Sequence, residues 1–126
     1  MWGTVIAVGI GGALGALCRY WTLMGFERWS GHCPWGTLGV NVAGCFVMGA
    51  LAEVMTLIWS PAPEIRAFLM TGFLGGFTTF SSYALDIGLL VARGAWLPAL
   101  TYAVLSAGLT VVAFMAALRL IRIILA

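Results

Sequence analysis

Charge is the scarcest property of this sequence. Only 8% of its 126 residues are charged, lysine is absent, and six arginines against four acids leave a net charge of +2. A soluble domain carries roughly 25% charged residues, so the composition excludes a water-soluble monomer and predicts an integral membrane protein. The small net charge also argues against nucleic acid as a partner, because nucleic-acid binding needs a basic stripe.

Groups for catalysis and metal binding are scarce as well. Cys18, Cys33 and Cys45 share no paired spacing, which indicates neither a disulfide framework nor a metal site. The single histidine, His32, falls in a predicted loop, so no Ser/His/Asp or Cys/His arrangement is available and we expect no enzyme. A proton-coupled carrier normally needs a titratable group at mid-membrane, whereas all four acids fall near the ends of predicted spans: Glu27, Glu53, Glu64 and Asp86.

Apolar residues dominate the chain, with 63% hydrophobic residues and a mean hydropathy of +1.09. Each helical crossing of a membrane needs about 20 mostly apolar residues. We predict one all-α domain with four transmembrane helices, over about 4–26, 37–59, 65–91 and 96–126. Pro61 and Pro63 stop the second span. Tryptophans lie near the predicted ends, where the membrane interface holds indole rings: Trp2, Trp29, Trp35, Trp59 and Trp96.

The arginines divide evenly between the two sides of such a bundle. One side, with both termini, carries Arg66, Arg119 and Arg122, and the other carries Arg19, Arg28 and Arg93. Orientation follows an imbalance of basic residues between the sides, so an even split predicts dual topology. An antiparallel homodimer follows, because two oppositely inserted copies make the inverted repeat that larger transporters build in one chain. The alternative is a fixed orientation set by a feature that the count misses.

The third span contains a run of poor helix formers at residues 75–79, Gly-Gly-Phe-Thr-Thr. A break in mid-membrane is tolerated only where it faces protein or a water-filled cavity, so we predict a functional break. Its free carbonyls would suit a small hard cation, and its amides and hydroxyls an anion. The alternative is close packing through the pairs Gly72/Gly76 and Gly11/Gly15, which is the interpretation we favour for the first span.

Polar side chains in the second and fourth spans indicate a polar path. Asn41 is the one strongly polar residue of the second span, and its amide must find a partner or line water. Tyr102, Ser106 and Thr110 recur every four residues and therefore share one helical face. The alternatives are interhelical hydrogen bonding by Asn41 and bonding of the hydroxyls to their own helix.

Aromatic rings follow the predicted break. Phe77, Phe80 and Tyr83 are spaced by three, so a resumed helix would bring them near one face. The edge of an aromatic ring carries positive quadrupole and would suit a small anion that has lost its water. Ordinary packing is the alternative interpretation of this stripe.

Taken together, these motifs resemble one family closely, the Fluc fluoride channels, also called CrcB-like proteins. The matching segments are residues 11–20, 36–44 and 71–82, and the length and four-span layout match over essentially the whole chain. The resemblance implies a dual-topology antiparallel homodimer in the bacterial inner membrane, with two pores that export cytoplasmic fluoride passively. It also implies a structural Na⁺ at the dimer axis.

The resemblance assigns roles to individual residues. The pore asparagine falls on Asn41, the first pore phenylalanine on Phe80 and the second on Tyr83, where this chain departs from the family's phenylalanine. The family's polar track falls on Thr79, Tyr102, Ser106 and Thr110. The Na⁺ ligands correspond to the backbone carbonyls of Gly75 and Thr78. The vestibule arginine falls on Arg19, which would either attract anions or extend to the end of its helix.

Two other functions fit the same layout. A small dual-topology multidrug transporter has similar length and span count but uses a glutamate in its first span, and this chain has none between Thr4 and Phe26. A non-transporting membrane assembly subunit would use the hydroxyl stripe only to hold helices together.

Overall fold

The computed structural model describes residues 1–31 and 34–126, which form helices and short connections without a strand. His32 and Cys33, both assigned to the first loop, lie outside the described residues. In chain order the helices are α1 (Trp2–Ser30), α2 (Trp35–Leu57), α3 (Pro63–Arg66), the π-helix η1 (Ala67–Leu74), α4 (Gly75–Phe77), α5 (Phe80–Ala92) and α6 (Trp96–Leu125).

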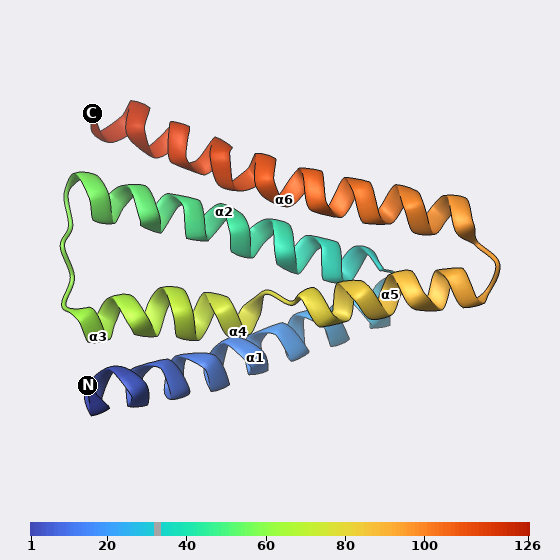
Figure 1. Cartoon of the computed structure of the whole chain (residues 1–126), viewed down its shortest axis with the longest axis horizontal. Helices are drawn as coiled ribbons and strands as arrows, with labels where there is room; N and C mark the ends of the chain where they lie inside the picture. The colour runs from blue at the N-terminus through green and yellow to red at the C-terminus, as the bar shows by residue number, and fades with distance from the viewer. Residues whose placement is uncertain (32–33) are drawn as a thin grey trace.

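Four helical stretches of the described chain are long and apolar enough to cross a membrane: Trp2–Ser30, Trp35–Leu57, Pro63–Ala92 and Trp96–Leu125. The prediction of an all-α membrane protein with four spanning helices is thus confirmed. The stretches lie side by side, with both termini and the α2–α3 connection at one end (Figure 1). The connection between α5 and α6 lies at the opposite end (Figure 1). Within the bundle α2 packs chiefly on α6, and α1 packs chiefly on η1.

Local sequence explains where the third stretch begins and ends. Pro63 opens α3 at a position where its missing N–H has no helical partner. At the other end Gly94 has a φ of 75°, its amide donates to Val91 O, and the next amide, of Ala95, donates to Leu90 O. These two bonds form a Schellman motif, which needs a left-handed residue such as glycine.

Glycines bring α1 into backbone contact with η1 and α4. A methyl group on Gly11 would lie 2.5 Å from the carbonyl oxygen of Phe68, and one on Gly76 would lie 2.5 Å from the carbonyl oxygen of Gly12. A methyl group on Gly15 would overlap the Phe73 carbonyl. The close packing that we favoured for the first span is therefore confirmed, and it positions α1 against the half-helix that leads into the break.

Burial in this chain differs from that in a soluble protein. Large apolar side chains are exposed along the spans, with Leu97 75% exposed and Ile123 81% exposed. Polar side chains are buried beside apolar ones such as Val40 and Leu74: Thr37, Asn41, Glu53, Thr79 and Ser106. An apolar exterior around a polar interior fits a bundle that faces lipid.

One charged residue, Arg19, lies elsewhere than the sequence predicted. The assignment of Arg19 to the side of the first loop is wrong, because α1 continues to Ser30 and the Arg19 guanidinium turns to the backbone of Thr78. Asp86 lies in the last two turns of α5, near a span end as predicted, and the Tyr102 hydroxyl donates to it. The difference at Arg19 arises from its contact with the third stretch.

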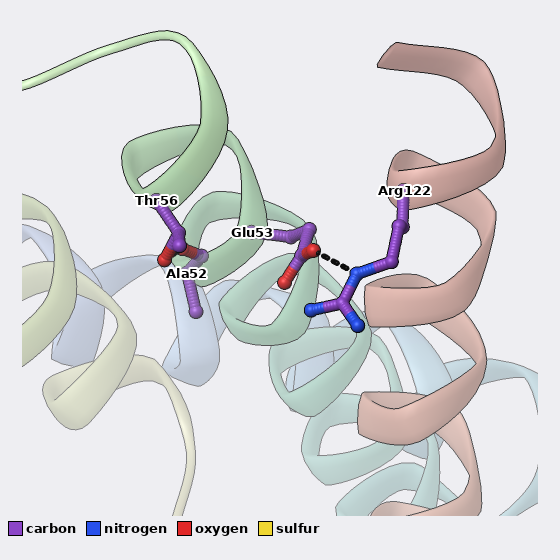
Figure 2. Close-up of polar contacts among 4 residues, drawn as sticks. All are labelled: Ala52, Glu53, Thr56 and Arg122. Atoms are coloured by element: carbon purple, nitrogen blue, oxygen red, sulfur yellow. Dashed lines mark hydrogen bonds and ion pairs between the residues drawn. The ribbon is translucent and has the colours of Figure 1, made fainter. Parts of the chain in front are cut away.

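An ion pair joins α2 to α6 near the end that carries the termini (Figure 2). Arg122 Nε donates to Glu53 Oε1 at 2.6 Å. The Glu53 side chain is 4% exposed and that of Arg122 is 66% exposed, so the arginine reaches inward to neutralise a buried carboxylate.

Candidate ion pathway at the helix break

The third stretch is broken at Thr78 and Thr79. Both residues are extended, with φ and ψ of −80° and 156° at Thr78 and −151° and 121° at Thr79. Thr79 is the N-cap of α5, where its Oγ1 accepts a hydrogen bond from the Ser82 amide at 3.1 Å. The predicted break is confirmed, and the second threonine starts the new helix.

The break changes the partners of several carbonyl groups, among them Gly75 O and Thr78 O. In a continuous helix the Thr79 amide would donate to Gly75 O and the Ser82 amide to Thr78 O. Here the Thr79 amide donates to the side chain of Asn41, and the Ser82 amide donates to Thr79 Oγ1. The carbonyls of Gly75 and Thr78 therefore lose their helical donors, and Thr78 O accepts instead from Arg19 Nη1 at 3.1 Å.

Asn41 holds the break from α2. Its Oδ1 accepts from the Thr79 amide at 2.7 Å, and its Nδ2 donates to Thr79 O at 2.9 Å. Both groups are buried, with Asn41 8% exposed and Thr79 7% exposed. Interhelical hydrogen bonding, the alternative considered for Asn41, thus does occur. A primary amide has two N–H donors, so one hydrogen of Nδ2 remains beyond this pair.

A cavity of about 470 Å³ lies beside the break, between α2, α5 and α6. None of its lining residues is charged, and they present amide, hydroxyl, thiol, backbone, aromatic and aliphatic groups. The lining residues are Asn41, Cys45, Gly75, Thr78, Thr79, Phe80, Tyr83, Ser106, Ala107, Thr110 and Val111. The tertiary structure therefore brings together most of the residues predicted for the pore. Of the predicted set, Tyr102 and Arg19 do not line it.

Sequence analysis missed three lining residues, Cys45, Ala107 and Val111. Each follows another lining residue by one helical turn or sits next to one: Cys45 lies four residues after Asn41, and Val111 four after Ala107. Spacing alone would have found them, but as apolar or weakly polar residues they gave no chemical signal.

The hydroxyls predicted as a track on α6 are engaged in different ways. Ser106 is 2% exposed and reaches the cavity. Thr110 Oγ1 lies 2.9 Å from both Ser106 O and Ala107 O, so it bonds to its own helix. The Tyr102 hydroxyl donates to Asp86 Oδ2 at 2.9 Å. Asp86 in turn lines a second cavity of about 260 Å³ between α1, α2 and α5.

Aromatic rings continue from the cavity toward Tyr102. The Phe80 and Tyr83 rings are 5.2 Å apart and tilted by 42°, and the Tyr83 and Tyr102 rings are 5.7 Å apart and tilted by 38°. The expectation that Phe77 shares their face is wrong. Phe77 stacks on Phe73 at 6.3 Å instead, because the two extended residues of the break separate it from α5.

The CrcB-like family model, described as "CrcB-like protein, Camphor Resistance (CrcB)", matches residues 6–118. The chain belongs to this family. Among its relatives is a protein of Rhodospirillum centenum named fluoride-specific ion channel FluC, 53% identical over 119 residues and 94% of each chain.

Two further relatives carry the same name. The protein of Rhizobium leguminosarum bv. trifolii is 46% identical over 93% of this chain and 94% of its own. The protein of Nitrobacter winogradskyi is 40% identical over 98% of both chains. The resemblance drawn from the sequence motifs is therefore confirmed, and it extends over nearly the whole CrcB-like chain.

The break of this CrcB-like chain has oxygen ligands suited to a small hard cation. Gly75 O and Thr78 O are neutral oxygens without their helical donors, which is the chemistry that such a cation prefers. The Arg19 guanidinium occupies one lone pair of Thr78 O, and a carbonyl oxygen has two. The two carbonyl oxygens therefore fit a cation, and the positive charge of Arg19 lies close to them.

Proposed function

We propose that the protein is a fluoride-selective channel through which cytoplasmic fluoride leaves the cell passively. The observation that carries the proposal is the uncharged polar cavity at the helix break, in a chain whose relatives are named fluoride-specific ion channels. A channel makes and breaks no covalent bond, so we infer that the protein is not an enzyme.

The uncharged lining suits a small, strongly hydrated anion. A fixed charge about 4 Å from the ion would hold it by about 4 kcal/mol at an effective dielectric near 20, and conduction requires sites that the ion can leave. Neutral groups provide weaker sites: the remaining N–H of Asn41, the Ser106 hydroxyl and the ring edge of Phe80. We infer that fluoride exchanges its water for these groups, one after another.

The residues assigned from the family divide into two roles in this mechanism. Asn41, Phe80 and Ser106 would contact the ion, because each lines the cavity and has a donor or ring edge to offer. Thr79 and Thr110 also line it, but each hydroxyl already has partners within hydrogen-bond distance. Tyr102 would act at the far side of the aromatic rings, through its bond to Asp86.

We infer that the working unit is an antiparallel homodimer with two pores. Phe80 is 80% exposed in the single chain, and the cavity beside it is open. A polar ion path cannot stay open to lipid, because its polar groups would be left without partners. A second copy of the chain would cover it. The arginine count is compatible with both orientations. Arg66 ends α3, and Arg119 and Arg122 lie in the last turns of α6, whereas Arg28 lies in the last turn of α1 and Arg93 is the C-cap of α5.

A structural Na⁺ at the axis of this dimer is part of the same proposal. The carbonyl oxygens of Gly75 and Thr78 from each copy would hold it, as the family resemblance implies. A bound cation would stabilise the ends of the two half-helices and favour anions nearby. The proposed location is the bacterial inner membrane, which the four apolar stretches and the channel relatives support.

Efflux from liposomes tests the proposal directly. Purified protein in liposomes loaded with fluoride should release it to a fluoride electrode, whereas chloride-loaded liposomes should retain chloride. Release of organic cations without fluoride would indicate the multidrug transporter instead. Absence of transport by folded protein would indicate an assembly subunit, and either result would overturn the proposed channel.

A further inference from the structure

The Tyr83 hydroxyl joins α5 to α6. Its Oη donates to Ala103 O at 2.8 Å, across 20 residues of sequence. In a continuous helix Ala103 O also accepts the amide of Ala107, and a carbonyl oxygen has two lone pairs to receive both donors. We name this hydrogen bond the Tyr83 anchor.

The anchor removes the Tyr83 hydroxyl from the donors available to an anion. A phenol has one hydrogen to donate, and here Ala103 O receives it. The phenolic oxygen then presents only lone pairs, which repel an anion. What Tyr83 can offer to the cavity that it lines is the edge of its ring.

The helix that carries Tyr83 has few other attachments inside the chain. All residues of α5 are described, and none of them is buried. Two hydroxyls bridge α5 and α6 in opposite directions: Tyr83 of α5 donates to Ala103, and Tyr102 of α6 donates to Asp86. Because the Tyr83 ring lies between Phe80 and Tyr102, fixing its hydroxyl also fixes the position of its neighbours' rings.

From this geometry we propose that Tyr83 is a positioning residue, whose hydroxyl holds the Phe80 and Tyr83 rings in register with Ser106 on α6. The inference rests on the proposed fluoride channel and adds to it. At the position where the family has phenylalanine, this chain holds its pore rings by a hydrogen bond as well as by packing.

The test compares the native protein with Tyr83→Phe, which keeps the ring and removes the anchor. Tyr20→Phe is the matched control, because Tyr20 is 58% exposed on α1. In each protein 4-trifluoromethylphenylalanine replaces Phe80 and reports the ring arrangement by ¹⁹F NMR in lipid nanodiscs. Fluoride and chloride efflux and thermal unfolding are measured on the same proteins without the label.

We expect a single narrow ¹⁹F resonance from the native protein and from Tyr20→Phe. In Tyr83→Phe a second ring arrangement should gain population by about threefold to tenfold, the range that loss of one neutral hydrogen bond gives. Fluoride efflux per folded protein should fall in proportion to the population that leaves the native ring arrangement, with chloride still excluded.

Other outcomes overturn the proposal. A lower melting temperature with an unchanged ¹⁹F spectrum and unchanged efflux would mean that the anchor only stabilises the fold. Loss of chloride exclusion with an unchanged spectrum would mean that the hydroxyl acts on the ion itself. If the native protein carries no fluoride, the channel proposal fails, while the ¹⁹F comparison still decides whether the hydroxyl positions the rings.

Discussion

The side chain of Asn41 and the backbone of Thr79 form a two-point pair, with Oδ1 accepting at 2.7 Å and Nδ2 donating at 2.9 Å. An amide side chain can pair with the N–H and the C=O of one residue in this way because it carries both an acceptor and a donor. Asn41 therefore supplies from α2 the acceptor that the Thr79 amide lacks in its own helix, and it adds a donor to Thr79 O. The same side chain lines the proposed ion path, so Asn41 both stabilises the break and faces the ion.

Asn41→Asp should abolish fluoride efflux. A carboxylate cannot donate to Thr79 O, and it places a negative charge where fluoride would pass, with a repulsion of about 4 kcal/mol at about 4 Å and an effective dielectric near 20. We expect efflux to fall by more than about a hundredfold, as measured with a fluoride electrode. Ser30→Asp, which adds the same charge at the exposed end of α1, is the control. Equal rates in both variants would remove Asn41 from the pathway.

Gly15→Ala should destabilise the bundle, because the added methyl group meets the Phe73 carbonyl. Overpacking of this kind typically costs about 1–3 kcal/mol. Gly88→Ala is the matched control: a methyl group there meets nothing within 4 Å, and alanine is the better helix former. Thermal unfolding in detergent should show a lower midpoint for Gly15→Ala and an equal or higher one for Gly88→Ala. A similar midpoint for both would mean that α1 can move away from η1 at little cost.

The two halves of the Glu53–Arg122 pair should respond unequally to mutation. Arg122→Gln leaves a buried carboxylate without its cation, whereas Glu53→Gln frees an arginine that is already 66% exposed and can turn to water. We therefore expect the lower melting temperature for Arg122→Gln. The double variant Glu53→Gln/Arg122→Gln should recover part of the lost melting temperature. A larger decrease for Glu53→Gln than for Arg122→Gln would contradict the view that the buried carboxylate depends on its cation.

Reporters at the C-terminus test dual topology. One reporter fluoresces only in the cytoplasm, and the other is active only outside it. Both C-terminal fusions should give a signal if the chain inserts in both orientations. Lysines added next to Arg122 should bias insertion to one orientation and reduce efflux, and co-expression with an oppositely biased copy should restore it. Full efflux from a protein with a single orientation would refute the antiparallel dimer.

Replacement of Na⁺ tests the proposed cation site independently of transport. A ligand that binds only the folded protein stabilises it, by about 2.7 kcal/mol at a hundred times its dissociation constant. The melting temperature should therefore rise with Na⁺ and stay constant with N-methylglucamine at equal ionic strength. An equal response to both cations would show a salt effect, and Gly75 O and Thr78 O would no longer be assigned to Na⁺.

The sequence by itself determined the membrane character, the four spans and the position of the break. These properties depend on composition and on residues close together in the chain: apolar runs, prolines between spans, and two threonines after two glycines. The polar set at the break was also recognisable, because an uncharged donor such as Asn41 has few reasons to lie within an apolar helix.

Only the tertiary structure decided which partner each polar group takes. Arg19 bonds to Thr78 O, Tyr83 to Ala103 O and Glu53 to Arg122, and each pair joins different helices. The spacing of residues does not show how far a side chain extends. Nor does it show which backbone carbonyl, such as Ala103 O, accepts a second hydrogen bond. The break shows the same limit: its place follows from local propensity, but the acceptor of the Thr79 amide is a side chain of another helix, Asn41 of α2.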